Sequence, residues 1–192
     1  MKITVFNSLT LDGVIQGPGS AEEDTRGGFT KGGWAHRYHD PVMMEIAGEG
    51  MAQGGPLLFG RRTYEQFHSF WPNQPDDNPF TQVLNNATKY VVSRTLDDTL
   101  PWQNSVLLRG DAAETVAELK EQPGPDAVIL GSGELVRSLM PHGLIDSYTL
   151  QIHPLLLGEG QRLFPDGVST EFKLVNSVPT TTGVIVATYE PA

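Results

Sequence analysis

The sequence predicts a single α/β domain over residues 1–192, with a mixed, mostly parallel central sheet, helices on both of its faces and antiparallel C-terminal strands. Up to residue 140, short apolar runs alternate with stretches of helical spacing, which is typical of a parallel sheet covered by helices. The remainder holds strand-like segments without helices between them. The chain contains neither an internal repeat nor a polar linker that would separate two domains.

The strands are predicted from apolar runs that end at glycine, proline or polar turns. The first run ends at Asp12-Gly13, and the continuous apolar run at 127–130 is typical of a strand buried on both faces. The expected strands are residues 3–11, 56–59, 89–93, 105–108, 127–130, 145–152, 172–178 and 184–189.

The helices are predicted where apolar residues recur at helical spacing. They cover residues 38–53, 61–67, 112–121 and 134–140, and Pro141 ends the last of them. The glycine-rich stretch 17–34 is too long for a simple connection, so we interpret it as a lid, a binding loop or a disordered segment.

Composition limits the classes of function. The 192 residues include 13 basic and 23 acidic side chains, a formal charge of −10, which argues against nucleic acid or an anionic membrane as a partner. The chain has no cysteine, which excludes disulfides, thiolate metal sites and cysteine nucleophiles. Neither a signal peptide nor a membrane span is visible, so we expect a cytoplasmic protein. Any bound anion must be small and held by local basic groups.

Three predicted strand ends carry groups that suit phosphate, and in an open α/β sheet ligands bind outside the carboxyl ends of the strands. Glycine lets the backbone approach a ligand closely, helix N-termini offer N–H groups, and guanidinium groups donate paired hydrogen bonds. The three segments are Gly60, Arg61, Arg62 and Thr63; Ser93, Arg94 and Thr95; and Gly131, Ser132 and Gly133. Together they predict a site for a nucleotide with several phosphates.

Each segment also has a structural interpretation. A glycine turn is required for backbone geometry in many proteins, and Arg61 and Arg62 could be solvated surface charges. The patterns G-x-G-x-x-G, G-x-x-x-x-G-K-[ST] and G-x-S-x-G do not occur, so a typical dinucleotide fold, a P-loop and a serine nucleophile are not indicated. His36 and His39 with Asp40 fit a solvated helix start better than a metal site, and no metal is expected.

These residues resemble the dihydrofolate reductase-like family, and most closely the stand-alone relatives of the C-terminal reductase domain of the bifunctional riboflavin-synthesis deaminase/reductase. The likeness covers nearly the whole chain in the right order. It is carried by the segments 8–13, 32–34, 60–65, 91–94, 131–135, 145–146, 153–160 and 163–164.

The resemblance implies NADPH as the cofactor. Carried over by motif, Gly60 to Thr63 would hold the pyrophosphate and adenosine, and Ser93 with Arg94 would face the 2′-phosphate. The arginines favour the phosphorylated cofactor, whereas Asp97-Asp98 would favour NAD. Gly131 to Leu135, Glu134 included, would meet the pyrophosphate and the nicotinamide ribose. The mobile segment 14–17, with Ile15, would close over the nicotinamide, and 158–160 would lie in the loop that leans against it.

Reduction of a heterocycle also needs a proton source. In dihydrofolate reductases a buried carboxylate early in the first long helix serves this purpose. Asp40 is the nearest candidate, followed by Glu45, and Asp12 is a further option. Asp40 before Pro41 equally fits a helix cap, and Asp12 before Gly13 equally fits a turn.

Trp34 and Tyr38 are the candidate substrate-binding residues, because aromatic rings stack on planar heterocycles; they could instead pack the glycine-rich loop onto the body of the protein. The resemblance implies an NADPH-dependent reductase of a small pterin-like, folate-like or aminopyrimidine-like substrate, related to 5-amino-6-(5-phosphoribosylamino)uracil reductase, and a homodimer. The alternative is an NADP(H)-binding sensor or partner module without efficient catalysis.

Overall fold

The computed structural model describes residues 1–52, 54–75 and 77–192. These residues form two compact units. The parallel-sheet unit comprises Met1–Thr4 and Ala47–Asp146, and the antiparallel-sheet unit comprises Val5–Ile46 and Ser147–Ala192. The assignment of residues 1–192 to one domain stays a prediction.

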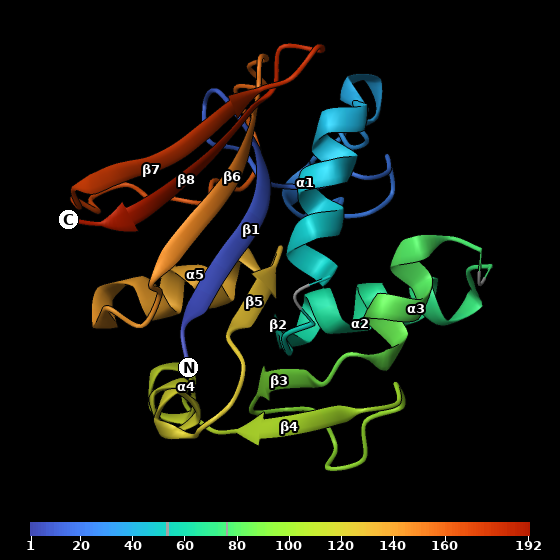
Figure 1. Cartoon of the computed structure of the whole chain (residues 1–192), viewed down its shortest axis with the longest axis vertical. Coiled ribbons are helices and arrows are strands. Elements are labelled where there is room, and N and C mark those ends of the chain that lie inside the picture. The colour runs from blue at the N-terminus through green and yellow to red at the C-terminus, as the bar shows by residue number, and fades with distance from the viewer. Residues whose placement is uncertain (53, 76) are drawn as a thin grey trace. The chain divides into compact units, whose positions relative to one another are not determined.

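The sheet of the first unit is parallel, as predicted. Its strands are β2 (Leu57–Gly60), β3 (Lys89–Ser93), β4 (Ser105–Arg109) and β5 (Ala127–Leu130). They lie side by side in the order β4-β3-β2-β5 (Figure 1). The apolar strands β2 and β5 are buried on both faces, whereas β4 lies at the edge of the sheet and is partly exposed.

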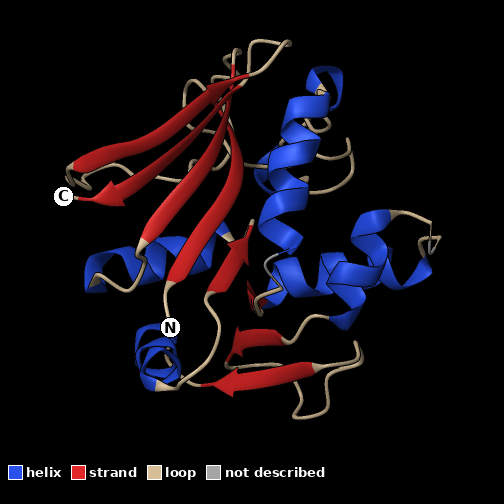
Figure 2. Ribbon diagram, viewed as in Figure 1, coloured by secondary structure: helices blue, strands red, loops and turns tan. Residues whose placement is uncertain are grey.

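Helices connect these strands and cover both faces of the sheet. They are α2 (Arg61–Phe70), α3 (Pro79–Asn86), α4 (Ala112–Glu121) and α5 (Gly133–Leu139), with short 3-10 turns at Trp71–Asn73 and Met140–His142. Connections between parallel strands are right-handed. The connection through α2 runs from β2 to β3, and the connection through α4 runs in the opposite direction across the sheet, from β4 to β5. The two helices therefore lie on opposite faces (Figure 2). The expected helices on both faces are therefore confirmed.

Three helices differ from the sequence predictions by more than one residue, and one of them, α2, ends at Phe70, three residues after its predicted end. α3 was not predicted, although Asn78 caps it by accepting a hydrogen bond from the amide of Phe80 and Pro79 takes its first position. α1 (Pro41–Ala52) begins three residues later than predicted, because Tyr38 belongs to a separate 3-10 turn, His36–Tyr38. Residue 53, the predicted end of this helix, lies outside the described residues.

The antiparallel-sheet unit contains the strand-rich C-terminal part. Its strands β1 (Ile3–Thr10, of which the first two residues belong to the other unit), β6 (Ser147–His153), β8 (Ile185–Pro191) and β7 (Phe172–Pro179) lie in that order. β8 pairs antiparallel with both β6 and β7, which confirms the predicted antiparallel C-terminal strands. The glycine-rich stretch is irregular apart from a 3-10 turn at Arg26–Gly28, and the 3-10 turn at His36–Tyr38 follows it.

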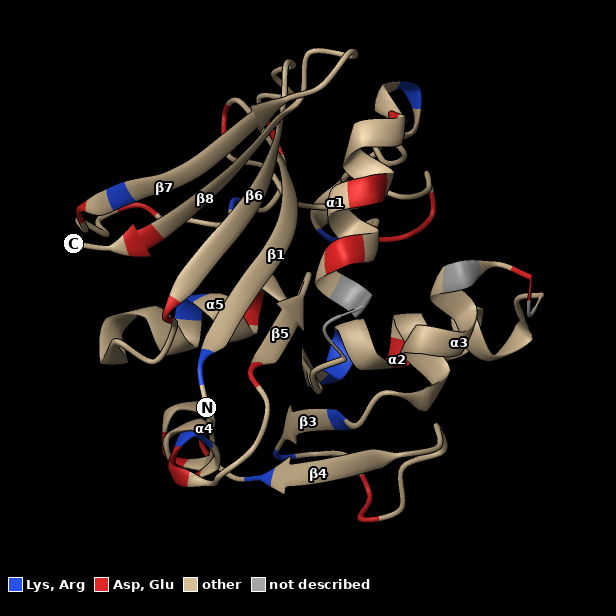
Figure 3. Cartoon of the chain, viewed as in Figure 1, with Lys and Arg blue, Asp and Glu red and all other residues tan. Residues whose placement is uncertain are grey.

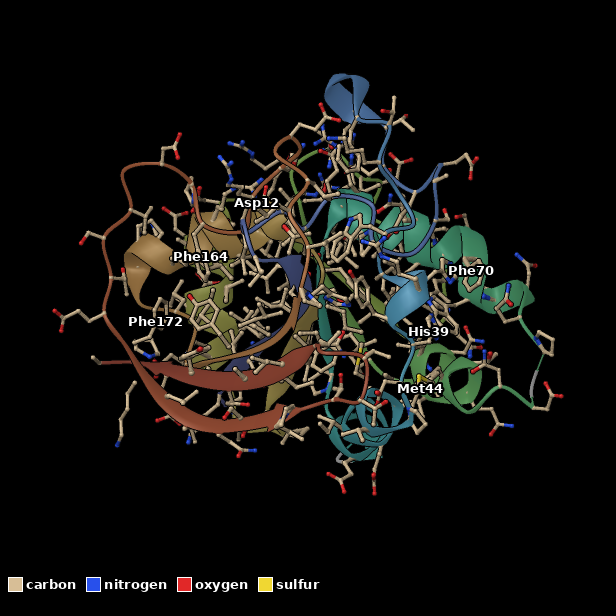
Figure 4. All side chains as sticks on the ribbon, turned by 90° about the horizontal axis from the view of Figure 1, so that it is seen from above. Asp12, His39, Met44, Phe70, Phe164 and Phe172 are labelled. Carbon is tan, nitrogen blue, oxygen red and sulfur yellow. The ribbon has the colours of Figure 1, made fainter. Side chains whose placement is uncertain are left out.

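Each unit has its own apolar centre. In the parallel-sheet unit, side chains such as Leu58, Phe59 and Ile129 are completely buried. In the antiparallel-sheet unit, Tyr148 is buried against the rings of Phe164 and Phe172, and Figure 4 shows those two rings side by side. Within the described part of the chain, every helix is too short or too polar to cross a membrane.

Candidate functional site

The carboxyl ends of the four parallel strands meet at one edge of their sheet. Gly60 at the end of β2 pairs with Val92 of β3, and Ser93 pairs with Arg109 at the end of β4. β5 is parallel to β2, so the turn that begins at Gly131 leaves the same edge. The prediction that the three glycine and arginine segments share one edge is confirmed. We call residues 60–63, 93–98 and 131–135 the strand-end turns.

The first turn of α2 is electrostatically unusual. A helix N-terminus carries a partial positive charge, which favours acidic side chains and disfavours basic ones. α2 nevertheless begins with Arg61 and Arg62 and has no acidic residue in its first turn. Gly60 at the cap position contributes no capping side chain. This accumulation of positive charge is stabilised if an anion binds there (Figure 3).

The turns after β2 and β5 are linked by two reciprocal hydrogen bonds. The amide of Gly60 donates to Oγ of Ser132 (3.1 Å), and the amide of Ser132 donates to Oγ1 of Thr63 (3.1 Å). Ser132 is buried and has a left-handed backbone (φ 51°, ψ 47°) directly after Gly131, whose φ is 59°. The amides of Gly60 and Ser132 thus have partners within the protein.

The turn after β3 is held by hydrogen bonds at both of its ends. Oγ of Ser93 accepts from the amides of Thr95 and Leu96 (both 3.1 Å). The guanidinium of Arg109 donates to the carbonyl of Leu96 (2.7 Å) and to the carboxylate of Asp98 (2.7 Å). This geometry brings Arg109 to the same edge as the predicted arginines. Sequence reasoning missed it, although it follows directly on the predicted strand 105–108.

The arginines of the strand-end turns have exposed, replaceable partners. Arg61 donates to Oγ1 of Thr95 (2.9 Å) and lies 3.7 Å from Glu65, and Arg62 pairs with Glu134. Exposed ion pairs contribute only about 0–1 kcal/mol, so a multiply charged anion can compete for these groups. Arg94 is also exposed.

Asp12 lies in the turn that follows β1, in the antiparallel-sheet unit (labelled in Figure 4). Its carboxylate accepts hydrogen bonds from the hydroxyl of Thr10 and from the amides of Leu157 (3.2 Å) and Gly158 (2.7 Å). Burial opposes ionisation, but these three hydrogen bonds outweigh it and lower the pKa of Asp12 below its usual value. Asp12 therefore fastens the 157–158 loop to the β1 turn.

Asp40 is buried and fully engaged by hydrogen bonds. It accepts from the hydroxyl and amide of Thr181, the latter at 2.8 Å, from the amide of Thr182 (3.1 Å) and from the amide of Val42 (2.8 Å). The hydroxyl of Thr181 is the main cause of its lowered pKa. The bond to Val42 is the cap that Asp40-Pro41 predicts. These contacts describe a structural carboxylate, and its catalytic role stays a prediction.

Trp34 and Tyr38 pack against a buried histidine. Their ring centroids lie 5.0 Å and 5.4 Å from that of His153, each edge to face. Trp34 is buried and donates from Nε1 to the carbonyl of Gln16 (2.8 Å), and the Arg37 guanidinium lies 4.9 Å from the ring of Tyr38. This arrangement agrees with the structural interpretation, in which the two aromatic residues pack the glycine-rich loop onto the body of the protein. Stacking on a substrate stays a prediction.

His153 is a residue that sequence reasoning did not single out. Its Nδ1 lies 2.9 Å from the carbonyl of Gln151, and its Nε2 is buried without a hydrogen-bond partner among the described residues. Burial is the main cause of its lowered pKa. The only sequence signal was its place at the start of the motif 153–160.

The segment 14–17 is anchored to the loop 158–161 and to the glycine-rich stretch. The amide of Ile15 donates to the carbonyl of Gln161 (2.9 Å), and the buried side chain of Gln16 bonds both the amide of Gln161 (3.0 Å) and the carbonyl of Arg26 (2.9 Å). A cavity of about 270 Å³ adjoins these contacts. It is lined by Gln16, Arg26, Gly27, Gly28, Phe29, Glu159, Gly160 and Gln161.

Histidine and acidic side chains do not gather into a metal site in the described ranges 1–52, 54–75 and 77–192. The rings of His36 and His39 stack at 5.3 Å. These two histidines would supply two ligands, whereas a typical zinc site has three or four protein ligands.

Comparisons with known proteins agree with this architecture. The family model described as the RibD C-terminal domain matches residues 1–186. The uncharacterized protein YyaP of Bacillus subtilis (strain 168) is 27% identical over 192 residues, which is 98% of this chain and 94% of that protein. A second Bacillus subtilis protein, the uncharacterized protein YwjB, is 30% identical over 118 residues, or 62% of each chain.

Solved structures show the same fold. A putative riboflavin biosynthesis protein from Shewanella sp. PV-4 is similar with a TM-score of 0.74 and 23% identity, over 100% of this chain and 99% of that one. Dihydrofolate reductase from Enterococcus faecalis, complexed with NADP(H) and RAB-propyl, has a TM-score of 0.66 and 18% identity, over 99% and 96%. The dihydrofolate reductase-like fold expected from the sequence is confirmed.

Proposed function

The chain belongs to the RibD C-terminal domain family, and on that premise we propose that it is an NADPH-dependent reductase that transfers a hydride to a small heterocyclic substrate. The observation that carries the proposal is the edge of the parallel sheet, where Arg61, Arg62, Arg94 and Arg109 end in or beside the strand-end turns. The chain has a charge of −10, so this concentration of guanidinium groups needs a local reason. A polyphosphorylated coenzyme supplies one.

The donor set fits such a coenzyme. The first turn of α2 presents positive charge without a capping side chain, which suits a pyrophosphate. Arg61, oriented by Thr95, and the exposed Arg94 suit a terminal phosphate on the ribose, because guanidinium groups bind phosphate with paired hydrogen bonds. When bound, NADPH supplies the hydride, and the protein orients it and excludes water.

Asp98 affects the choice between the two coenzymes. A carboxylate near the adenosine ribose favours the unphosphorylated coenzyme. Here the carboxylate of Asp98 is engaged by Arg109 at 2.7 Å, so its charge is compensated by a neighbouring guanidinium. We therefore propose NADPH in preference to NADH.

The second candidate is an NADP(H)-binding module without efficient catalysis. One observation favours it: Asp12 and Asp40, the two carboxylates predicted to give a proton, both have lowered pKa values and several hydrogen-bond donors. A carboxylate that is ionised near neutral pH is a poor proton donor. An enzyme with this chain would then take its proton from water or from another group.

The two candidates differ in turnover. The purified protein is mixed with NADPH and a panel of pterins, dihydrofolate and aminopyrimidine ribityl compounds, and nicotinamide absorbance is followed. Oxidation that needs both protein and acceptor supports the reductase. Tight NADPH binding without turnover on any acceptor supports the binding module, and the absence of NADPH binding contradicts both.

Asp40→Asn adds a test of the proton source. If the contacts of Asp40 to Thr181 and Val42 define its role, the variant unfolds at a lower temperature and keeps the kcat and pH profile of the wild-type protein. A complete loss of turnover with unchanged thermal stability would instead assign the proton to Asp40.

A further inference from the structure

We infer that Ser132 and Thr63 are positioning residues, which brace the turns after β2 and β5 into one rigid cradle so that the first turn of α2 is held in place for the coenzyme. This inference rests on the proposed function. It differs from a role as ligands, because the two hydroxyls act through the backbone that they hold.

The hydrogen bonds form a closed pair across the two turns. Ser132 accepts from the amide of Gly60 and donates its own amide to Thr63, and both donor–acceptor distances are 3.1 Å. Gly60 is the residue before α2, and Thr63 lies in the first turn of that helix. The residue before α2 and a residue in its first turn are thus both hydrogen-bonded to Ser132, which is 72 and 69 residues away in the sequence.

The backbone of Ser132 indicates that its hydroxyl is needed. Its φ of 51° lies in the left-handed region, which glycine adopts without penalty and other residues rarely adopt. Among the described residues, only Asn104 is another non-glycine residue with a positive φ. This conformation costs free energy in a residue other than glycine, and the hydrogen bond to the Gly60 amide offsets part of that cost.

Side-chain packing supports the same link. The Cβ atom that a residue other than glycine would have at position 60 would lie 3.6 Å from Cβ of Leu135, and one at position 131 would lie 3.5 Å from the methyl group of Thr63. The two turns therefore lie so close that one added methyl group at either glycine would be in van der Waals contact with the other turn. The ion pair between Arg62 and Glu134 bridges them on the exposed side.

The test compares Thr63→Val, Thr63→Ser, Ser132→Gly and the wild-type protein. Thr63→Val keeps the shape and removes the acceptor, Thr63→Ser keeps the hydroxyl, and Ser132→Gly removes both the acceptor and the backbone strain. Kd values for NADPH and NADH are measured by titration of nicotinamide fluorescence. Thr115→Val is the matched control, because its hydroxyl bonds the carbonyl of Asp111 (2.8 Å), the cap residue of α4, and neither residue belongs to the strand-end turns.

We expect Thr63→Val and Ser132→Gly to raise the Kd values for NADPH and NADH by the same factor, about 5- to 10-fold. This factor corresponds to one lost hydrogen bond. Thr63→Ser and Thr115→Val should stay within about 2-fold of the wild-type Kd. Variants that melt earlier but bind as tightly as the wild-type protein would overturn the brace. A loss confined to NADPH would also overturn it, since it would place the hydroxyls at the 2′-phosphate.

Amide exchange followed by NMR keeps the inference testable without coenzyme or if a variant does not fold. In the free wild-type protein, the amides of Gly60 and Ser132 should exchange slowly because both are donors within the brace. Fast exchange of either amide would contradict it. If the wild-type protein binds neither NADPH nor NADH while both amides are protected, the proposed function fails and the brace stands as a structural feature.

Discussion

Arginines at the strand-end turns of the parallel-sheet unit are exposed and have weak or replaceable partners, whereas the carboxylates of the antiparallel-sheet unit have several donors each. Arg61 and Arg62 pair with exposed side chains, but Asp40 is buried with four hydrogen bonds and Asp12 holds three. Charges that are already satisfied stabilise loops. Charges that gather without strong partners are available to a ligand.

The largest expected effect on coenzyme binding concerns the arginines. Arg61→Ala and Arg94→Ala should each raise the Kd for NADPH by about 10- to 150-fold, because a charge-assisted contact is worth about 1.5–3 kcal/mol. NADH should be affected much less, since it lacks the 2′-phosphate. Calorimetric titration of both coenzymes measures the difference, with the exposed Lys173→Ala as the control. Equal losses for the two coenzymes would contradict the 2′-phosphate assignment.

Lys89, in the same unit, is a buried cation, in contrast to the exposed arginines. It is completely buried, donates to the carbonyls of Asn85, Ala87 and Gln103 at 2.8–3.0 Å, and lies 4.4 Å from the centroid of the Trp102 ring. Burial lowers its pKa to about 8, so it is still mostly protonated at neutral pH.

Lys89→Met should therefore reduce the free energy of unfolding by about 2–4 kcal/mol, because it leaves buried carbonyls without donors. Urea denaturation at neutral pH measures the change. Lys173→Met, at an exposed position of β7, should stay within about 0.5 kcal/mol of the wild-type protein. If the two variants were equally stable, the carbonyls near Lys89 would have found other partners.

His153 gives the antiparallel-sheet unit a smaller, pH-dependent effect. Its folded-state pKa lies below the ordinary value of 6.5, so the unfolded chain takes up the proton first. The contribution of His153 to the free energy of unfolding is then complete above about pH 6.5. It decreases as the pH falls, by less than about 1.4 kcal/mol per pH unit. His153→Phe should flatten this dependence in denaturation curves at about pH 7.5 and 5.5. An unchanged slope would place the responsible group elsewhere.

The smallest expected effect is a gain. Glu134→Gln removes the charged partner of Arg62, which frees that guanidinium for an anion. Because the pair is exposed, NADPH should bind at most about 5-fold more tightly, and thermal stability should change little. Weaker binding would mean that the carboxylate itself contacts the coenzyme.

Much of the fold follows from local patterns. Alternating apolar runs and helical spacing place strands and helices where the structure has them, since both elements depend on short-range periodicity. The helix α3 was missed because residues 71–88 are rich in proline, asparagine and aspartate, although Asn78-Pro79 is itself a start signal.

By itself, the sequence determined the alternation of strands and helices, the absence of cysteine chemistry and the three arginine and glycine turns, because each depends on residues that are neighbours in the chain. The tertiary structure alone decided the rest. Arg109 reaches the site through the register of β3 and β4, and Asp40 bonds to Thr181, 141 residues away. Such long-range contacts depend on how elements pack, which local sequence does not encode.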